Sequence, residues 1–200
     1  MTGPAEPPAA KAVLRRSLLA RRRARPAPER AAAAAAVAAT LLRRLAGLGT
    51  LAAYVPDATE PGFGVLPAAY RRLGVPVLLP VVPDADRGLD WARDTGELRP
   101  GRYGLLEPVG PRSGPAGLSA ADAVVVPALA VDRSGVRLGR GGGYYDRALV
   151  HARPDAVLVT VVFDDERVDA LPREQHDRPV TAVVTPAGGW EELRPGTAGG

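Results

Sequence analysis

Glycine and charged side chains gather in one short segment, RLGRGGGYYDRAL, which spans residues 137–149. Four of the five residues from 139 to 143, here called the glycine loop, are glycines, so the backbone can turn tightly and expose amide N–H groups. A helix is expected to begin at Tyr144, and the free N–H groups of its first turn would face the same ligand. Arg137 and Arg140 add positive charge. We therefore expect this segment to hold a polyphosphate.

Asp146 follows the glycine loop and suggests a metal ion. A carboxylate beside a triphosphate would be repelled unless a divalent cation lay between them, and hard oxygen ligands suit magnesium. Two other roles remain open for Asp146, an ion pair with Arg147 and a cap on the helix. The loop fits neither G-x-x-x-x-G-K-[ST] nor G-x-G-x-x-G before a helix, so a plain turn between a strand and a helix also remains open.

The single lysine of the chain is a second candidate for phosphate binding. Of 26 basic residues, 25 are arginines and one is Lys11, so a site that needs a compact ammonium instead of a planar guanidinium would explain the exception. Arg15 lies four residues further on, and this spacing places both cations on one face of a helix. A chance surface lysine is the alternative.

The elements that must position these residues follow from the hydrophobic pattern. Two helices are expected first, at about 8–24 and 29–45. Short apolar runs and helical patterns then alternate, with strands expected at 51–55, 75–82, 122–132, 156–163 and 181–185 and helices at 66–73 and 144–152. Such alternation predicts an α/β fold in three layers, a central mostly parallel sheet flanked by helices, with the site at the carboxyl ends of its strands.

The rest of the chain is expected to be less regular. Residues 83–117 are rich in proline and glycine and are expected to form a long irregular connection, of the kind that often carries function. Residues 1–8 and about 187–200 are expected to be frayed tails. Two hundred residues with 46% apolar content suffice for one sizeable core, so we predict a single domain over 1–200.

Composition excludes several classes of protein. Without cysteine, the chain can have no disulfide framework, thiolate nucleophile or thiolate metal site. The longest apolar run, residues 31–42, is about half of the roughly 20 residues that a bilayer span needs, so no membrane helix is expected. The first thirty residues lack the apolar core of a secretory signal, and we expect a cytoplasmic protein. Their arginine-rich, acid-poor composition leaves a mitochondrial presequence open.

The basic charge does not by itself indicate a nucleic-acid partner. The net charge is +4 and the pI about 9.9, but the excess is small and is concentrated in the arginines between residues 15 and 25. We interpret that run as a solvated helix face. Aromatic stacking platforms and known nucleic-acid motifs are missing from the sequence, so no nucleic-acid partner is expected.

The segment 137–149 resembles the C-terminal half of the 5-formyltetrahydrofolate cyclo-ligases, also called methenyltetrahydrofolate synthetases. VPALAVD precedes it, and a strand and then LPREQHDRPVTAVVTP follow it. Four earlier blocks are similar to the family in the same order: KAVLR at 11–15, LAAYVPDATE at 51–60, VPVLLPVV at 75–82 and GRYGLLEP at 101–108. The resemblance covers about residues 10–186, and five blocks in order make it specific.

This resemblance implies a role for each matching position. The catalytic cations would be Lys11, Arg15 and Arg140. ATP would be bound by Lys11, Arg15, Arg137, Leu138, Gly139, Arg140, Gly141, Gly142, Gly143, Tyr144 and Tyr145. The folate would be bound by Tyr54, Glu60, Tyr103, Arg140, Gly141, Gly142, Gly143 and Tyr144, and magnesium by Asp146 and Asp177.

Some of these positions keep an alternative. Tyr54 and Tyr103 could instead be ordinary core or rim residues. Some relatives carry a lysine where this chain has Gly142, and Arg140 would then supply the missing charge.

The resemblance also implies the reaction. We expect a monomer that uses ATP and Mg²⁺ to close 5-formyltetrahydrofolate, with or without a polyglutamate tail, into 5,10-methenyltetrahydrofolate, releasing ADP and phosphate. Two alternatives on the same scaffold remain: an enzyme like a sugar-phosphate isomerase, and a non-enzymatic protein that binds a phosphate or a nucleotide.

Overall fold

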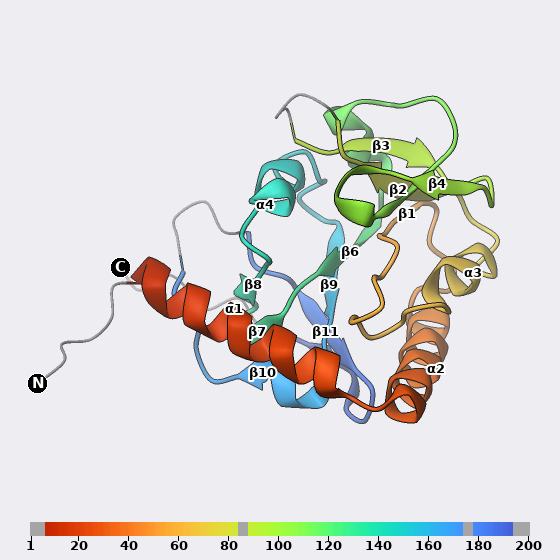
Figure 1. Ribbon diagram of the computed structural model, residues 1–200. Coiled ribbons are helices and arrows are strands. Elements are labelled where there is room, and N and C mark those ends of the chain that lie inside the picture. The colour runs from red at the N-terminus through yellow and green to blue at the C-terminus, as the bar shows by residue number, and fades with distance from the viewer. Residues whose placement is uncertain (1–6, 84–87, 174–177, 194–200) are drawn as a thin grey trace, which may run out of the picture.

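A central sheet organises the molecule. The computed structural model describes residues 7–83, 88–173 and 178–193 (Figure 1). In this part of the chain, seven strands form one sheet in the order β12-β11-β9-β6-β1-β2-β3. The parallel strands are β1 (Leu51–Ala52), β2 (Val77–Val81), β6 (Ala123–Pro127), β9 (Val157–Val161) and β11 (Ala182–Thr185). The antiparallel edges are β3 (Asp90–Arg93) and β12 (Gly189–Glu192).

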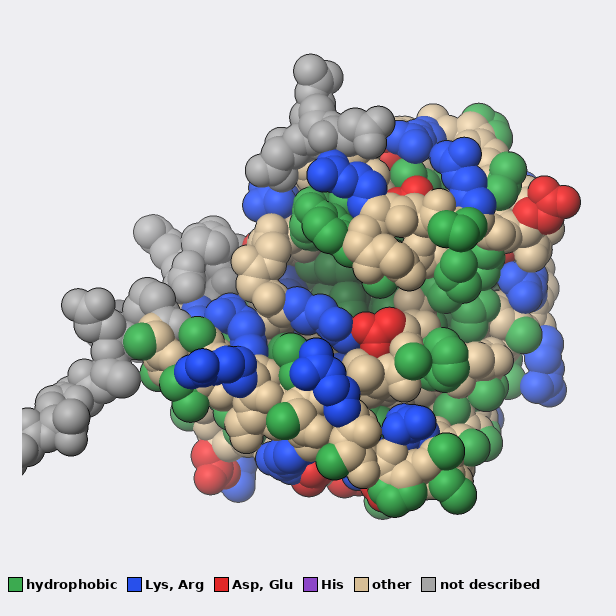
Figure 2. Space-filling model, in the orientation of Figure 1, with side chains coloured by type: hydrophobic (Ala, Val, Ile, Leu, Met, Phe, Trp, Pro, Cys, Tyr) green, Lys and Arg blue, Asp and Glu red, His purple; other side chains and the backbone are tan. Residues whose placement is uncertain are grey.

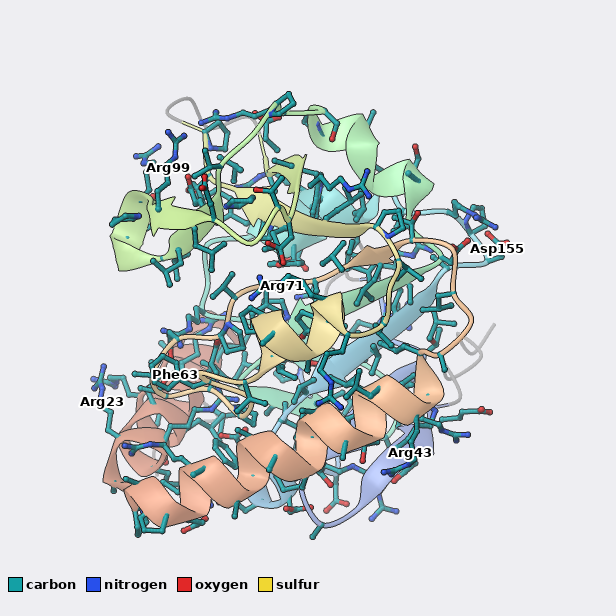
Figure 3. The ribbon with its side chains drawn as sticks, turned by 90° about the vertical axis from the view of Figure 1, so that its right-hand side faces the viewer. Arg23, Arg43, Phe63, Arg71, Arg99 and Asp155 are labelled. Carbon is teal, nitrogen blue, oxygen red and sulfur yellow. The ribbon has the colours of Figure 1, made fainter. Side chains whose placement is uncertain are left out.

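The sheet is buried on both faces, which explains its valine-rich strands. Along β6, Val124 and Val126 belong to one hydrophobic core and Ala123 and Val125 to the other, because successive side chains of a strand point to opposite faces. Helices α2 (Ala27–Arg44) and α3 (Leu66–Arg71) cover one face side by side (Figure 3). Helix α4 (Tyr144–Leu149) and the 3-10 helix η2 (Pro115–Ala120) pack on the other core. The predicted three-layer α/β fold is confirmed.

Helix α1 (Pro7–Ala24) packs on a second, smaller sheet (Figure 1). This sheet has the order β10 (Arg167–Val168), β7 (Ala130–Asp132) and β8 (Arg137–Leu138). Leu18 of α1 is buried there against Leu129, Val136 and Leu138. Because β8 leads directly into the glycine loop, this packing sets the loop beside α1.

The arginine run of α1 corrects one prediction. Arg21 and Arg23 are exposed as expected, but Arg22 is fully buried. Its Nε and Nη2 each donate to the Glu166 carboxylate at 2.7 Å, and Nη2 also donates to the carbonyl of Ala128 at 2.7 Å. The reason is helical spacing, since Arg22 lies four residues after Leu18 on the packed face of the helix. Glu166 ends the 3-10 helix η3 (Asp164–Glu166).

Two segments are more regular than predicted. The stretch expected to be irregular contains β3, β4 (Leu98–Pro100), the 3-10 helix η1 (Arg102–Gly104), β5 (Leu106–Pro108) and η2. These elements are too short to give a periodic pattern, and pairing between strands stabilises them. The expected C-terminal tail contains β12, which pairs with β11 through Val184 and Trp190. At the other end, α1 already begins at Pro7.

Among the helices of the described ranges, none has the length and apolar character that a membrane span requires.

Candidate active site

A cavity of about 690 Å³ opens at the carboxyl ends of β1, β2 and β6. Figure 2 shows it as a hollow with basic side chains along its lower rim. Strand β1 pairs with β2 on one side and β6 on the other, so the cavity lies where the order of the strands reverses, the usual ligand site of an open parallel sheet. The structure thus has a cavity where the sequence predicted the site.

The cavity brings the predicted site residues together. Those that line it are Lys11, Arg15, Tyr54, Glu60, Tyr103, Arg137, Leu138, Gly139, Arg140, Gly141, Gly142, Gly143, Tyr144, Tyr145 and Asp146. Asp177 is the exception, because it lies outside the described residues. Segments as far apart in the sequence as Lys11 and Asp146 thus meet in one cavity.

One side of the cavity is cationic. The Nε of Arg15 donates to the carbonyl oxygen of Gly139 at 2.9 Å, which ties α1 to the glycine loop and places Lys11 on the same wall. Gly141 has φ of +101° and Gly143 has φ of +65°, backbone conformations that other residues rarely adopt. This wall therefore combines the exposed glycines Gly141 and Gly142 with side-chain cations, a combination suited to phosphate oxygens.

Asp146 lies at the edge of this cationic wall. Its Oδ1 is 2.5 Å from Nη2 of Arg137, a side chain that is itself only 6% exposed. The structure thus gives Asp146 an ion pair with Arg137, a partner that we did not predict. The described residues contain no group of three or more histidine, cysteine, aspartate or glutamate side chains that could hold a metal ion. A magnesium ion at Asp146 would therefore need further oxygen ligands.

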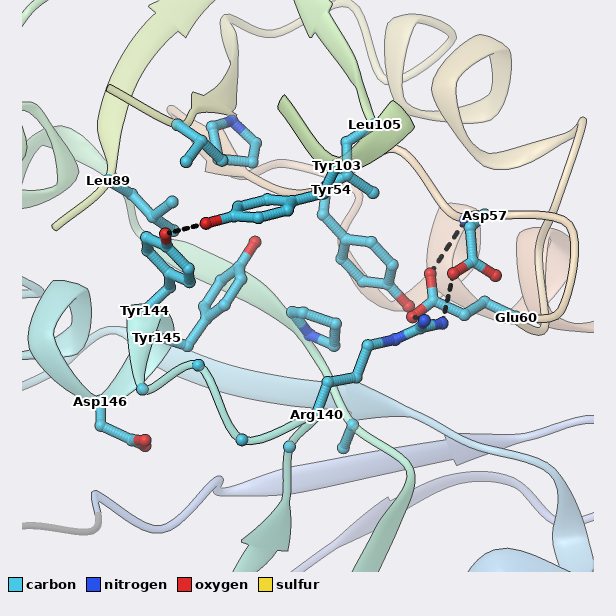
Figure 4. A pocket seen from close by; sticks show the side chains of 18 of the residues that line it. Tyr54, Asp57, Glu60, Leu89, Tyr103, Leu105, Arg140, Tyr144, Tyr145 and Asp146 are labelled. Atoms are coloured by element: carbon cyan, nitrogen blue, oxygen red, sulfur yellow. Dashed lines mark hydrogen bonds and ion pairs between the residues drawn. The ribbon is translucent and has the colours of Figure 1, made fainter. Parts of the chain in front are cut away.

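The opposite side of the cavity is acidic (Figure 4). Glu60 is only 7% exposed, and its Oε2 accepts a hydrogen bond of 3.0 Å from the backbone N–H of Asp57. Arg140 reaches across from the glycine loop, forms an ion pair with Asp57, and has its Nη2 at 3.4 Å from Oε1 of Glu60. Burial is the largest influence on Glu60 and raises the pKa of its carboxyl, as does the charge of Asp57, while Arg140 lowers it.

Four tyrosines complete the site (Figure 4). Tyr54 is buried, Tyr145 is partly buried with its hydroxyl inside, and burial raises the pKa of both phenols, so both are neutral hydrogen-bonding groups. The buried hydroxyl of Tyr145 finds no hydrogen-bond partner among the described residues. Tyr103 is 70% exposed, and its hydroxyl lies 3.1 Å from that of Tyr144 across the cavity. The residues form a surface for a flat, polar ring.

Sequence reasoning missed several residues of the cavity. Asp57 and Glu107 also line it, and Glu107 is buried, where its Oε1 accepts a 2.9 Å hydrogen bond from the N–H of Val82. Asp57 could have been found from its place just after a strand that ends at the site. The apolar wall had no such signal, because an aliphatic residue that lines a cavity has the same type as a core residue. Its members are Pro80, Val82, Leu89, Leu105 and Leu106.

Gly142 offers a test of the shape of the site. A Cβ atom at this position would lie 2.9 Å from the ring of Tyr144, so Gly142→Ala should displace that ring. We expect kcat/KM for the ligand of the cavity to fall by about tenfold, since displacements on the ångström scale commonly cost up to about 100-fold. Gly64→Ala is a strict control, because Gly64 has φ of +75° and lies outside the cavity lining, so an added methyl strains the backbone there without touching the site. Equal losses in the two variants would contradict this geometry.

Comparison with known proteins agrees with the five sequence blocks. The model of the 5-formyltetrahydrofolate cyclo-ligase family matches residues 7–186. The chain is 45% identical over 150 residues to a 5-formyltetrahydrofolate cyclo-ligase of Mycolicibacterium smegmatis, an alignment that covers 72% of this chain and 77% of the relative. It is also 35% identical over 134 residues to the 5-formyltetrahydrofolate cyclo-ligase of Escherichia coli K12. That alignment covers 66% of this chain and 73% of the relative.

The structural comparison extends this likeness over nearly the whole chain. The fold is similar to the NMR structure of Aquifex aeolicus 5,10-methenyltetrahydrofolate synthetase, with a TM-score of 0.74, 28% identity and 95% of both chains covered. With the family's blocks assembled around one cavity, this chain belongs to the 5-formyltetrahydrofolate cyclo-ligase family and is an enzyme of that family.

Proposed function

We propose that the protein is a cytoplasmic monomer that converts 5-formyltetrahydrofolate into 5,10-methenyltetrahydrofolate and couples this ring closure to the conversion of ATP into ADP and phosphate. The observation that carries the proposal is the division of one cavity into two chemically different halves. Lys11, Arg15 and the glycine loop form a cationic half, whereas Glu60 and the tyrosines form an acidic and aromatic half. Arg140 lies between them.

The cationic half suits a triphosphate. Its glycine backbone leaves room for phosphate oxygens, and Lys11 and Arg15 would neutralise charge on the transferred phosphoryl group. Magnesium would be held by Asp146 and Asp177, with phosphate oxygens as the further ligands, since magnesium is commonly bound by one or two carboxylates plus phosphates. When bound, the metal ion would supply charge neutralisation beside the cationic side chains.

The acidic half suits the pterin ring of the folate. Glu60 offers a buried carboxylate that can accept hydrogen bonds from ring N–H groups, and the unpartnered hydroxyl of Tyr145 offers a donor or an acceptor nearby. Tyr103 would lie against the ring face. Such contacts would orient the formyl group toward the cationic half.

The reaction needs phosphate because a formamide oxygen is a poor leaving group. The formyl oxygen attacks the γ-phosphorus of ATP, the bond from that phosphorus to the bridging oxygen breaks, and ADP leaves. N10 of the folate then attacks the formyl carbon and loses its proton, and the carbon–oxygen bond breaks to release phosphate. Lys11, Arg15, Arg140 and the loop N–H groups contribute by positioning and by stabilising negative charge on the phosphoryl oxygens.

Isotope transfer tests this proposal sharply. With ¹⁸O in the formyl group, each turnover should yield one ADP and one phosphate that carries a single ¹⁸O atom, measured by mass spectrometry. Omission of the folate should suppress ADP formation. Phosphate that carries no label during product formation would contradict activation through the formyl oxygen, and ADP release that does not depend on the folate would contradict the coupling.

A further inference from the structure

Arg22, the buried arginine of α1, has one donor group without a partner in the part of the chain that the structure describes. Its Nε and Nη2 are satisfied by Glu166 and by the carbonyl of Ala128. Its Nη1 is buried and has no hydrogen-bond partner among the described residues. That atom lies 4.0 Å from Oε1 of Glu60. Arg22 is fully buried and Glu60 nearly so, which means that water screens this pair of charges weakly.

Two opposing influences act on the carboxyl of Glu60. The charged and titratable groups that face it come from several elements: Asp57 and Tyr54 after β1, Tyr70 of α3, Tyr145 of α4, Arg140 of the glycine loop and Arg22 of α1. Burial and the negative charge of Asp57 disfavour the carboxylate, whereas the two arginines favour it. Arg140 and Arg22 are thus the cations that favour the ionised form of Glu60.

The side chains of these two arginines differ in how firmly they are held. The side chain of Arg140 is 48% exposed, shares its charge with Asp57, and belongs to the loop proposed to contact phosphate and folate. The side chain of Arg22 is fully buried, and the bidentate contact with Glu166 holds it in place. A phosphate group that attracts Arg140 would leave Arg22 as a fixed cation beside Glu60.

We propose that Arg22 is a positioning residue for the cyclo-ligase reaction, which keeps Glu60 a carboxylate directed at the substrate while Arg140 turns to the phosphoryl group. The catalytic role of Arg22 rests on the proposed function, whereas the effect of Arg22 on the carboxyl of Glu60 does not depend on it. It also links the two ligands of the cavity, because Arg22 lies on the same helix as Lys11 and Arg15. A purely structural ion pair with Glu166 is the competing explanation.

Two variants separate the explanations. Glu166→Gln keeps Arg22 and neutralises its main partner. The double variant Glu166→Gln with Arg22→Gln differs from it only at position 22, where the positive charge is removed. In protein labelled with ¹³C at the glutamate carboxyls, the Glu60 signal is assigned by its loss in Glu60→Gln and followed by NMR against pH. A positive charge lowers the pKa of a nearby carboxyl, so the titration midpoint of Glu60 should be about one pH unit higher in the double variant.

Each outcome decides the proposal. Equal midpoints in the two variants would overturn it. If the double variant does not fold, the comparison of Glu166→Gln with the unmodified protein decides, because an uncompensated Arg22 should move the Glu60 midpoint down, and an unchanged midpoint would overturn the proposal. The pH at which kcat/KM for 5-formyltetrahydrofolate falls on the acid side should shift between the variants in the same order as the titration midpoint of Glu60. Shifted midpoints without a shift in that pH would refute a role in the reaction, whereas absence of turnover in the unmodified protein would refute the proposed function instead.

Discussion

Asp146→Asn is expected to lower turnover by about 100-fold or more and to raise the magnesium concentration needed for half-maximal rate. The change removes a negative oxygen ligand with little change in shape, and a catalytic metal ion contributes several kcal/mol of charge stabilisation, where each 1.36 kcal/mol is about tenfold in rate. The measurement is the initial rate against magnesium concentration at saturating ATP and folate. Asp177→Asn should behave in the same way, although Asp177 lies outside the described residues.

The ion pair between Asp146 and Arg137 requires a control. Arg137→Gln breaks the same pair but leaves the carboxylate in place, so it should raise the KM for ATP without changing the magnesium requirement. A high magnesium concentration should restore part of the rate of Asp146→Asn and none of the rate of Arg137→Gln. A normal magnesium dependence in Asp146→Asn would show that this carboxylate serves only to hold Arg137.

Lys11→Arg is expected to impair the use of ATP although it conserves the charge. A guanidinium is broader than an ammonium and directs its donors in a plane, so it should not fit a phosphate pocket shaped for a point charge. Lys11→Met should be worse, because loss of a charge-assisted hydrogen bond of about 1.5–3 kcal/mol corresponds to about a 10- to 150-fold fall in kcat/KM for ATP. Binding of 5-formyltetrahydrofolate should change much less.

An exposed arginine on the same helix provides the control for Lys11. Arg16→Met removes a cation that does not line the cavity, so steady-state kinetics with varied ATP should be nearly unchanged. Melting temperatures of the variants should agree closely, since Lys11 is only partly buried. If Lys11→Arg has the same ATP KM and turnover as the unmodified protein, Lys11 is an ordinary surface lysine.

The sequence predicted the sheet well because its strands are buried on both faces. Runs such as residues 75–82 and 156–163 are almost wholly apolar, and their alternation with helices permits few arrangements other than a parallel sheet. The run 122–132, expected as one strand, instead divides into β6 of the central sheet and β7 of the smaller sheet. The short elements between residues 83 and 117 gave no comparable signal, because a strand of three or four residues completes too few periods. They depend on pairing with partners that the local sequence does not specify.

Site residues that belong to a local sequence motif were predicted, whereas those placed by contacts between distant segments were missed. The glycine loop, Lys11 and Asp146 were found from their own sequence contexts, and the structure places them in one cavity. Arg22 was misjudged because a helical run of arginines is usually solvated, and its burial depends on Glu166, 144 residues further along the chain. The ion pair of Asp146 with Arg137 also went unpredicted, since it joins a strand to a helix across the loop.

Formation of the methenyl product tests the central claim most directly. The purified protein is incubated with 5-formyltetrahydrofolate, ATP and Mg²⁺, and the near-ultraviolet absorbance of 5,10-methenyltetrahydrofolate is followed over time. We predict that absorbance rises only when the protein, the folate and ATP are all present, and that Glu60→Gln slows the rise. No product with any nucleotide would contradict the proposed function.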